Sequence, residues 1–102
     1  MTESINKKFV GTWDYEVTDT PNGDYDGQLV IEKDGKSYKG KMVAEGGSQD
    51  LRDLKIEGDN ISFKIYAEGF DCSISLTREG NSLKGKVKVD GETYPMTGIK
   101  KK

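Results

Sequence analysis

The sequence predicts one all-β domain, built as a closed eight-stranded antiparallel up-and-down barrel. Short segments alternate between apolar and polar residues, turns rich in glycine separate them, and no segment has the periodicity of a substantial helix. The chain has 102 residues with 13 glycines and two prolines, enough for one hydrophobic core. We expect a single domain over residues 1–102, with a short N-terminal turn segment at 1–9 and the barrel at 10–100.

Eight segments carry the alternation. In the first, Trp13, Tyr15 and Val17 share one face, and Asp14 and Glu16 share the other. The inward residues of the other seven are, in chain order, Leu29 and Ile31; Tyr38, Gly40, Met42 and Ala44; Leu54 and Ile56; Ile61, Phe63, Ile65 and Ala67; Phe70, Cys72, Ile74 and Leu76; Leu83, Gly85, Val87 and Val89; Tyr94, Met96 and Gly98. Closing such a sheet into a barrel removes edges that would otherwise aggregate.

The connections predict two different ends. Those after the second, fourth and sixth segments are tight and contain glycine, whereas residues 18–26 and 45–50 form longer loops. Alternate connections of a meander lie at the same end of the barrel. One end is therefore expected to be a closed base, and the other a mouth framed by the two long loops.

Two parts of the chain are similar to each other. Residues 31–41 match residues 76–86, and residues 13–17 match residues 61–65. A duplication of a four-stranded half would explain this, and so would turn chemistry shared by all hairpins. Gly40 and Gly85 lie within predicted strands, where a tightly coiled sheet must bend.

The composition disfavours catalysis and metal binding. The chain has no histidine, one cysteine and a net charge of −2. It therefore lacks the commonest general base and the usual transition-metal ligands. No nucleophile lies beside a base, and Cys72 is at a core position. We expect no enzyme activity, no cofactor and no metal.

Two polar groups have a functional and an ordinary interpretation. Asp19, Asn22, Asp24 and Asp26 could supply oxygen ligands to calcium, but their spacing favours ordinary turn chemistry. Five lysines project outward and could bind anions: Lys39, Lys41, Lys84, Lys86 and Lys88. Tyr66 is the only outward aromatic residue within a strand, so nucleic acid is not an expected partner.

The start of the first strand carries a family resemblance. Gly11-Thr12-Trp13, in an eight-stranded meander, resembles the lipocalin-like (calycin) barrels. The resemblance implies that Trp13 plugs the closed base and that a basic side chain of the last strand, here Lys100, packs across it. The hairpin residues 84–91 and the final Met96-Thr97-Gly98 are also similar to small calycin-like modules, found alone or appended to bacterial secreted hydrolases, for which no activity is established.

The inward residues near the mouth are almost all apolar, so they form either a ligand pocket or a filled core. The lipocalin resemblance implies a small apolar ligand, whereas the short strands and large side chains favour filling. The candidate ligand-binding residues are Val17, Leu29, Met42, Arg52, Ile65, Phe70, Val87, Tyr94 and Met96. Unbroken strand geometry would point Arg52 inward, but a bulge at residues 51–53 is favoured and would turn it outward.

These observations predict a monomeric, non-catalytic barrel that binds a small hydrophobic molecule in its mouth. The alternative is a structural or interaction module with a filled core and no ligand. No apolar segment is long enough to span a membrane. As written, the N-terminus has no signal peptide, which predicts a cytoplasmic protein, or a periplasmic or secreted one if a signal peptide has been removed.

Overall fold

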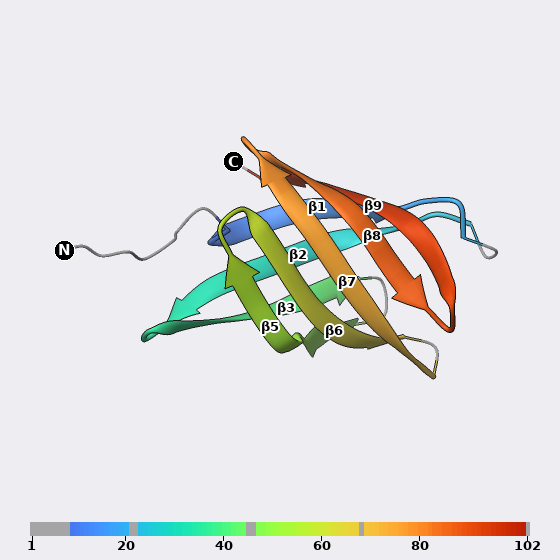
Figure 1. Cartoon of the computed structure of the whole chain (residues 1–102), viewed down its shortest axis with the longest axis horizontal. Coiled ribbons are helices and arrows are strands. Elements are labelled where there is room, and N and C mark those ends of the chain that lie inside the picture. Colours follow the sequence, from blue (N-terminus) through green and yellow to red (C-terminus); the bar gives the residue numbers. More distant parts are fainter. Residues whose placement is uncertain (1–8, 21–22, 45–46, 68, 102) are drawn as a thin grey trace.

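The strands form one antiparallel sheet that curls into a nearly closed barrel (Figure 1). The computed structural model describes residues 9–20, 23–44, 47–67 and 69–101. The strands are β1 (Gly11–Val17), β2 (Tyr25–Asp34), β3 (Ser37–Ala44), β4 (Gly47–Asp50), β5 (Arg52–Glu57), β6 (Asn60–Ala67), β7 (Phe70–Glu79), β8 (Ser82–Val89) and β9 (Glu92–Lys100). Their order is β4-β3-β2-β1-β9-β8-β7-β6-β5, so β1 and β9 pair and join the two ends of the chain.

The number of strands differs from the prediction because the expected long loop at 45–50 contains β4. This strand pairs with β3 through Val43↔Ser48 and Ala44↔Gly47. Its sequence, Gly-Ser-Gln-Asp, has no apolar alternation that would have indicated a strand. The prediction of two long loops at the mouth is therefore wrong, and only the connection between β1 and β2 is long.

The barrel closes where the chain changes partner between β4 and β5. Only Leu51 separates these strands, yet β4 pairs with β3 and β5 pairs with β6. The Leu51 N–H donates to the Gly40 carbonyl at 2.9 Å. The Gln49 side-chain amide donates to the Tyr66 carbonyl at 2.5 Å and accepts from the Tyr66 N–H at 2.7 Å. A side-chain amide thus replaces the backbone ladder between β4 and β6.

A bulge marks the same region, as predicted. The pairing of β5 with β6 shifts in register between Arg52 and Lys55, and Asp53 has a φ of 52°. A bulge twists a strand and redirects its side chains, which is what the change of partner requires.

The alternation predicted from the sequence sets the inside and outside of the barrel. Trp13, Tyr15 and Val17 are buried, whereas Asp14 and Glu16 are exposed. The buried core comprises Phe9, Trp13, Tyr15, Val17, Leu29, Ile31, Met42, Ile61, Phe63, Ile65, Cys72, Ile74, Leu76, Leu83, Val87 and Met96. None of the described residues belongs to a helix with the length and hydrophobicity of a membrane span.

The two similar hairpins have matching turns. Asp34 pairs with Ser37 and Glu79 pairs with Ser82, and each serine hydroxyl donates to the carbonyl of its partner. Gly35 and Gly80 both have a φ of 63°. Shared turn chemistry accounts for this similarity, and the internal duplication stays a hypothesis.

Gly85 allows β7 and β8 to approach closely, and its replacement by alanine is expected to destabilise the barrel. A Cβ at this position would lie 1.9 Å from the Ser75 carbonyl oxygen and 2.8 Å from the Leu76 Cα. Backbone atoms cannot rotate away, so the strands would have to separate. We expect the free energy of unfolding to fall by about 1–3 kcal/mol in Gly85→Ala, measured by urea denaturation.

Gly98 provides the matched control for this substitution. It is a buried strand glycine, but its nearest contacts to an added Cβ are ordinary, at 3.4–3.5 Å. Gly98→Ala should therefore be neutral, or more stable by up to about 1 kcal/mol. Equal losses of stability in the two variants would contradict the close approach at Gly85.

Candidate ligand cavity

A cavity of ≈ 780 Å³ occupies the end of the barrel where β1, β3, β6 and β8 finish. Its walls are formed mainly by apolar side chains of five strands, β1, β3, β6, β7 and β8. These side chains are Val17, Met42, Ala44, Ile65, Phe70, Cys72, Ile74, Val87 and Val89. The volume is within the range of small-molecule sites, and the mixture of apolar walls and few polar groups is typical of them.

Most predicted ligand-binding residues line this cavity. Six of the nine do so: Val17, Met42, Ile65, Phe70, Val87 and Tyr94. Leu29 and Met96 are buried, with exposed fractions of 0% and 1%, and lie in the core away from the cavity wall. Phe70 is 48% exposed, so the cavity reaches the surface beside it.

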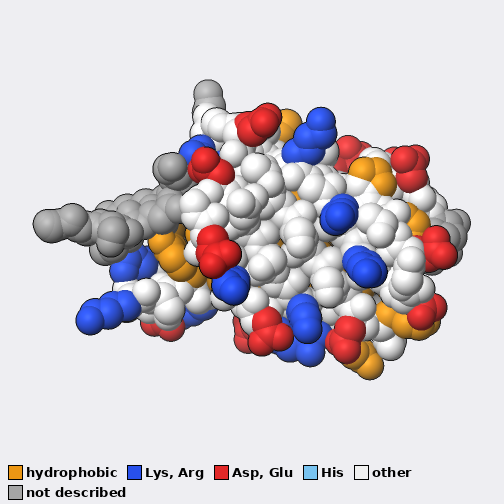
Figure 2. Space-filling model, in the orientation of Figure 1, with side chains coloured by type: hydrophobic (Ala, Val, Ile, Leu, Met, Phe, Trp, Pro, Cys, Tyr) orange, Lys and Arg blue, Asp and Glu red, His pale blue; other side chains and the backbone are white. Residues whose placement is uncertain are grey.

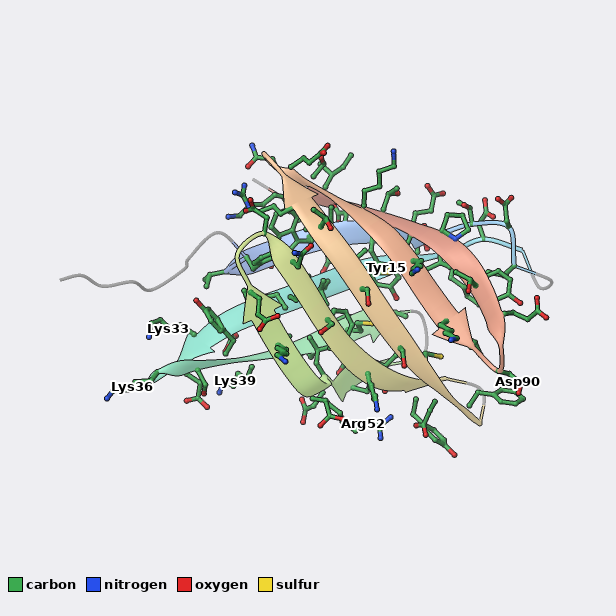
Figure 3. The ribbon with its side chains drawn as sticks, in the orientation of Figure 1. Tyr15, Lys33, Lys36, Lys39, Arg52 and Asp90 are labelled. Atoms are coloured by element: carbon green, nitrogen blue, oxygen red, sulfur yellow. The ribbon has the colours of Figure 1, made fainter. Side chains whose placement is uncertain are left out.

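Arg52 does not belong to the cavity, and its place among the ligand-binding residues is wrong. The bulge turns its side chain to the outside, where it is exposed. Its guanidinium donates to the Asp71 carboxylate at 2.7 Å and lies 5.9 Å from the centroid of the Tyr66 ring. Figure 3 shows the Arg52 side chain on the outside of the sheet. The alternative that Arg52 holds a carboxylate inside the barrel is thereby excluded.

The opposite end of the barrel is packed. Trp13 is fully buried, and its indole N–H donates to the Phe9 carbonyl at 2.9 Å. The Lys100 ammonium lies 5.5 Å from the centroid of the Trp13 ring. The same lysine passes close to Gly11, where an added Cβ would lie 3.0 Å from Lys100 Cε. Side chains thus fill this end of the barrel, whereas the mouth contains the cavity.

Tyr15 is a polar cavity residue that was missing from the predicted set. It is 6% exposed, and its hydroxyl has no hydrogen-bond partner among the described residues. Gly27 lies opposite on β2, and a Cβ there would be 2.8 Å from the Tyr15 hydroxyl oxygen. Burial, and next the negative charge of Asp26, raise the pKa of Tyr15.

This raised pKa predicts a loss of stability at alkaline pH. The folded barrel keeps the Tyr15 phenol protonated at pH values where the unfolded chain, with its ordinary pKa of 10.0, loses the proton. The stabilising contribution is therefore complete below about pH 10 and decreases as the pH rises through the higher folded value. We expect the difference in unfolding free energy between the native chain and Tyr15→Phe to change only above about pH 10. A difference that stays constant would contradict this account.

The open end of the cavity combines acidic and aromatic residues that the sequence did not single out as a group. Asp24, Asp26, Asp90 and Glu92 line it, together with Tyr25, Tyr66, Phe70 and Tyr94. Acidic and hydrophobic side chains gather at the right-hand end of the molecule in Figure 2. Asp90 lies at this end in Figure 3, opposite the end that carries Lys33, Lys36 and Lys39.

Asp90 and Glu92 are far in the sequence from Asp24 and Asp26, so only the barrel brings these residues together. The sequence feature that these acidic and aromatic residues share is their position, since each lies in or beside a connection at the mouth end. Gln49 and Ser48 were missed for another reason, because β4 itself was not predicted.

The other candidate groups form no site. Asp19, Asp24 and Asp26 are exposed, Asn22 lies outside the described residues, and the described part of the chain contains no cluster of three acidic or metal-ligating side chains.

The Cys72 thiol is buried in the cavity wall and directed at the Phe70 carbonyl. The five outward lysines are exposed as predicted. A smaller hollow of ≈ 330 Å³ is lined by residues of β5, β6, β7 and β8, among them Lys55, Ser75 and Lys86.

Comparison with solved structures identifies the architecture. Fatty-acid-binding protein 1 of Echinococcus granulosus matches with a TM-score of 0.63 and 16% identity, over 93% of this chain and 98% of that chain. Secretory abundant heat soluble protein 4 of Ramazzottius varieornatus matches with a TM-score of 0.62 and 14% identity, over 99% and 100% of the two chains. The fold is that of a lipocalin-like barrel.

A variant of the fluorescent protein UnaG also has this lipocalin-like fold, with a TM-score of 0.59 and 14% identity over 94% of this chain and 98% of that chain. No protein-family model matches the sequence, and no curated protein matches it. At these identities the similarity establishes the lipocalin-like fold alone, and the function must be argued from the cavity.

Proposed function

We propose that this lipocalin-like barrel is a non-catalytic binding protein that takes a small apolar molecule into the cavity at its mouth. The observation that carries the proposal is the contrast between the two ends. The base is packed around Trp13, whereas ≈ 780 Å³ lies open between apolar walls at the mouth. A barrel of this size can be filled completely by side chains, so an open end with apolar walls supports binding.

The comparison supports the same function. One of the similar structures is a fatty-acid-binding protein by name, and the match covers nearly all of both chains. The cavity walls are mainly apolar, and the chain has no histidine, the commonest general base. Binding is therefore a better explanation of the cavity than catalysis.

Uptake of a neutral apolar fluorophore tests the proposal. N-Phenyl-1-naphthylamine is weakly emissive in water and bright in apolar surroundings, and it carries no charge that could bind to the outer surface. We expect saturable, one-to-one binding with a blue-shifted emission. Fluorescence that remains at the level of the free dye, or that increases linearly without saturation, would contradict a ligand-binding cavity.

The alternative is an interaction module that acts through its outer surface, as the similarity to modules of bacterial secreted hydrolases suggests. Such a module does not need an accessible interior. Absence of saturable uptake by the intact barrel would favour this alternative.

A further inference from the structure

The charged groups at the mouth are all of one sign. Asp24, Asp26, Asp90 and Glu92 line the cavity, and none of the described lining residues is lysine or arginine. The positions 21–22, 45–46 and 68 also hold no basic residue in the sequence. The chain as a whole has a net charge of only −2, so the mouth is more negative than the rest of the protein.

The basic side chain that approaches the mouth from outside is already paired. Arg52 stacks on Tyr66 at 5.9 Å, but its guanidinium is bound to Asp71 at 2.7 Å. The three lysines of β8, Lys84, Lys86 and Lys88, face outward on the sheet and do not line the cavity. Among the described residues, an anionic ligand would therefore meet four carboxylates and no lysine or arginine in the cavity wall.

Aromatic rings are concentrated at the same opening. Tyr25, Tyr66 and Phe70 are 39%, 56% and 48% exposed, and all three line the cavity. Exposed apolar side chains that are gathered in one place, rather than scattered singly, often mark a binding site. Aromatic faces attract cations and apolar groups, and carboxylates beside them strengthen the attraction for a cation.

Tyr15 adds a polar group deeper in the wall. Its side chain is only 6% exposed, and its hydroxyl has no hydrogen-bond partner among the described residues. The hydroxyl is not among the fully buried polar atoms that lack a partner, so it is accessible from the cavity and can bind a polar group there. Burial is the larger cause of the raised pKa of Tyr15 and the negative charge of Asp26 is the smaller one, so this rim carboxylate also acts on the cavity wall.

We propose that the ligand is a small apolar molecule with a cationic head, an amine or ammonium, whose head lies at the acidic and aromatic rim and whose apolar body occupies the cavity. This inference rests on the proposed function and specifies its ligand class. It separates this chain from a carrier of anionic amphiphiles, because each carboxylate that favours a cation disfavours a carboxylate ligand.

Three probes with the same hydrocarbon chain test the charge preference. Decyltrimethylammonium, decanol and decanoate displace bound N-phenyl-1-naphthylamine, each below its micelle concentration and at low salt. We expect decyltrimethylammonium to bind about 10- to 100-fold more tightly than decanoate, with decanol between them, since several exposed carboxylates each contribute a modest amount. The preference should decrease at high salt because the rim is exposed to solvent.

Removal of rim charges should reduce the preference. In the double variant Asp26→Asn and Glu92→Gln, we expect decyltrimethylammonium to lose about four- to 25-fold in affinity, while decanol is unchanged. Glu79→Gln is the matched control, because Glu79 is an exposed acid in the turn between β7 and β8 at the closed end. It lowers the negative charge of the chain without changing the mouth, so it should leave the preference intact.

The possible outcomes separate the two proposals. In one outcome, decanol and the dye bind, and decanoate binds as tightly as decyltrimethylammonium. This result would overturn the proposal of a cationic ligand and would leave the proposal of a binding cavity in place. Loss of preference in Glu79→Gln equal to that in the double variant would also overturn the proposal of a cationic ligand. Failure of the dye to bind at all would overturn both proposals.

Discussion

Replacement of Trp13 by alanine is expected to lower the free energy of unfolding by about 3–5 kcal/mol. The side chain is fully buried at the closed end, and its indole N–H donates to the Phe9 carbonyl. The substitution leaves a void, removes the contact with Lys100, and leaves the Phe9 carbonyl without this donor. Urea denaturation followed by circular dichroism measures the change.

The control for this prediction is Ile99→Ala on the outer face of β9. Ile99 is 65% exposed, so its truncation should change the free energy of unfolding by no more than about 0.5 kcal/mol. If Trp13→Ala unfolds at the same urea concentration as the native protein, the account of a packed base is wrong.

Filling the mouth with tryptophan is expected to abolish ligand uptake while the barrel stays folded. Met42 on β3 and Val87 on β8 both line the cavity, and each is 6% exposed. A tryptophan at either position has open space to occupy, so the strain should stay within about 1–3 kcal/mol. The expected result is loss of saturable N-phenyl-1-naphthylamine binding in Met42→Trp and in Val87→Trp, with a native-like circular dichroism spectrum and cooperative thermal unfolding.

The neighbouring outward residues give matched controls. Lys41→Trp and Lys88→Trp add the same side chain one position away, on the outside of the same strands. These variants should bind the dye like the native protein. Full binding by both cavity variants would place the dye outside the barrel and contradict the assignment of the site.

The alternation of apolar and polar residues was sufficient to predict the barrel. Every predicted strand has a counterpart, because side chains that alternate along a strand must separate into a core face and a solvent face. Trp13 and Lys100 lie together at the closed end for the same reason, since their positions follow from strand parity and from the pairing of β1 with β9.

The closure between β3 and β6 could not be predicted in this way. β4 is too short and too polar to produce an alternation, and its contact with β6 is made by the side-chain amide of Gln49 rather than by a backbone ladder. The bulge at Asp53 was predicted from its place at the rim, and it decides that Arg52 lies outside.

The sequence was sufficient to predict which residues form the cavity walls, but not which residues form its rim. Val17, Met42 and Val87 are inward by parity, so their positions at the mouth follow from the sequence. Whether these side chains meet across the barrel depends on its diameter, which alternation does not determine. The four rim carboxylates come from two separate parts of the chain, residues 24–26 and 90–92, and their common sign becomes visible only when these parts are placed side by side.

Native mass spectrometry of the intact barrel shows directly whether the cavity holds a ligand. The spectrum is recorded for protein purified gently from its own source, and again after addition of N-phenyl-1-naphthylamine. We expect a discrete additional mass, at a ratio of one to one, that disappears on denaturation. The bare polypeptide mass in both samples would contradict this expectation and would show that the mouth of the barrel takes up no small molecule.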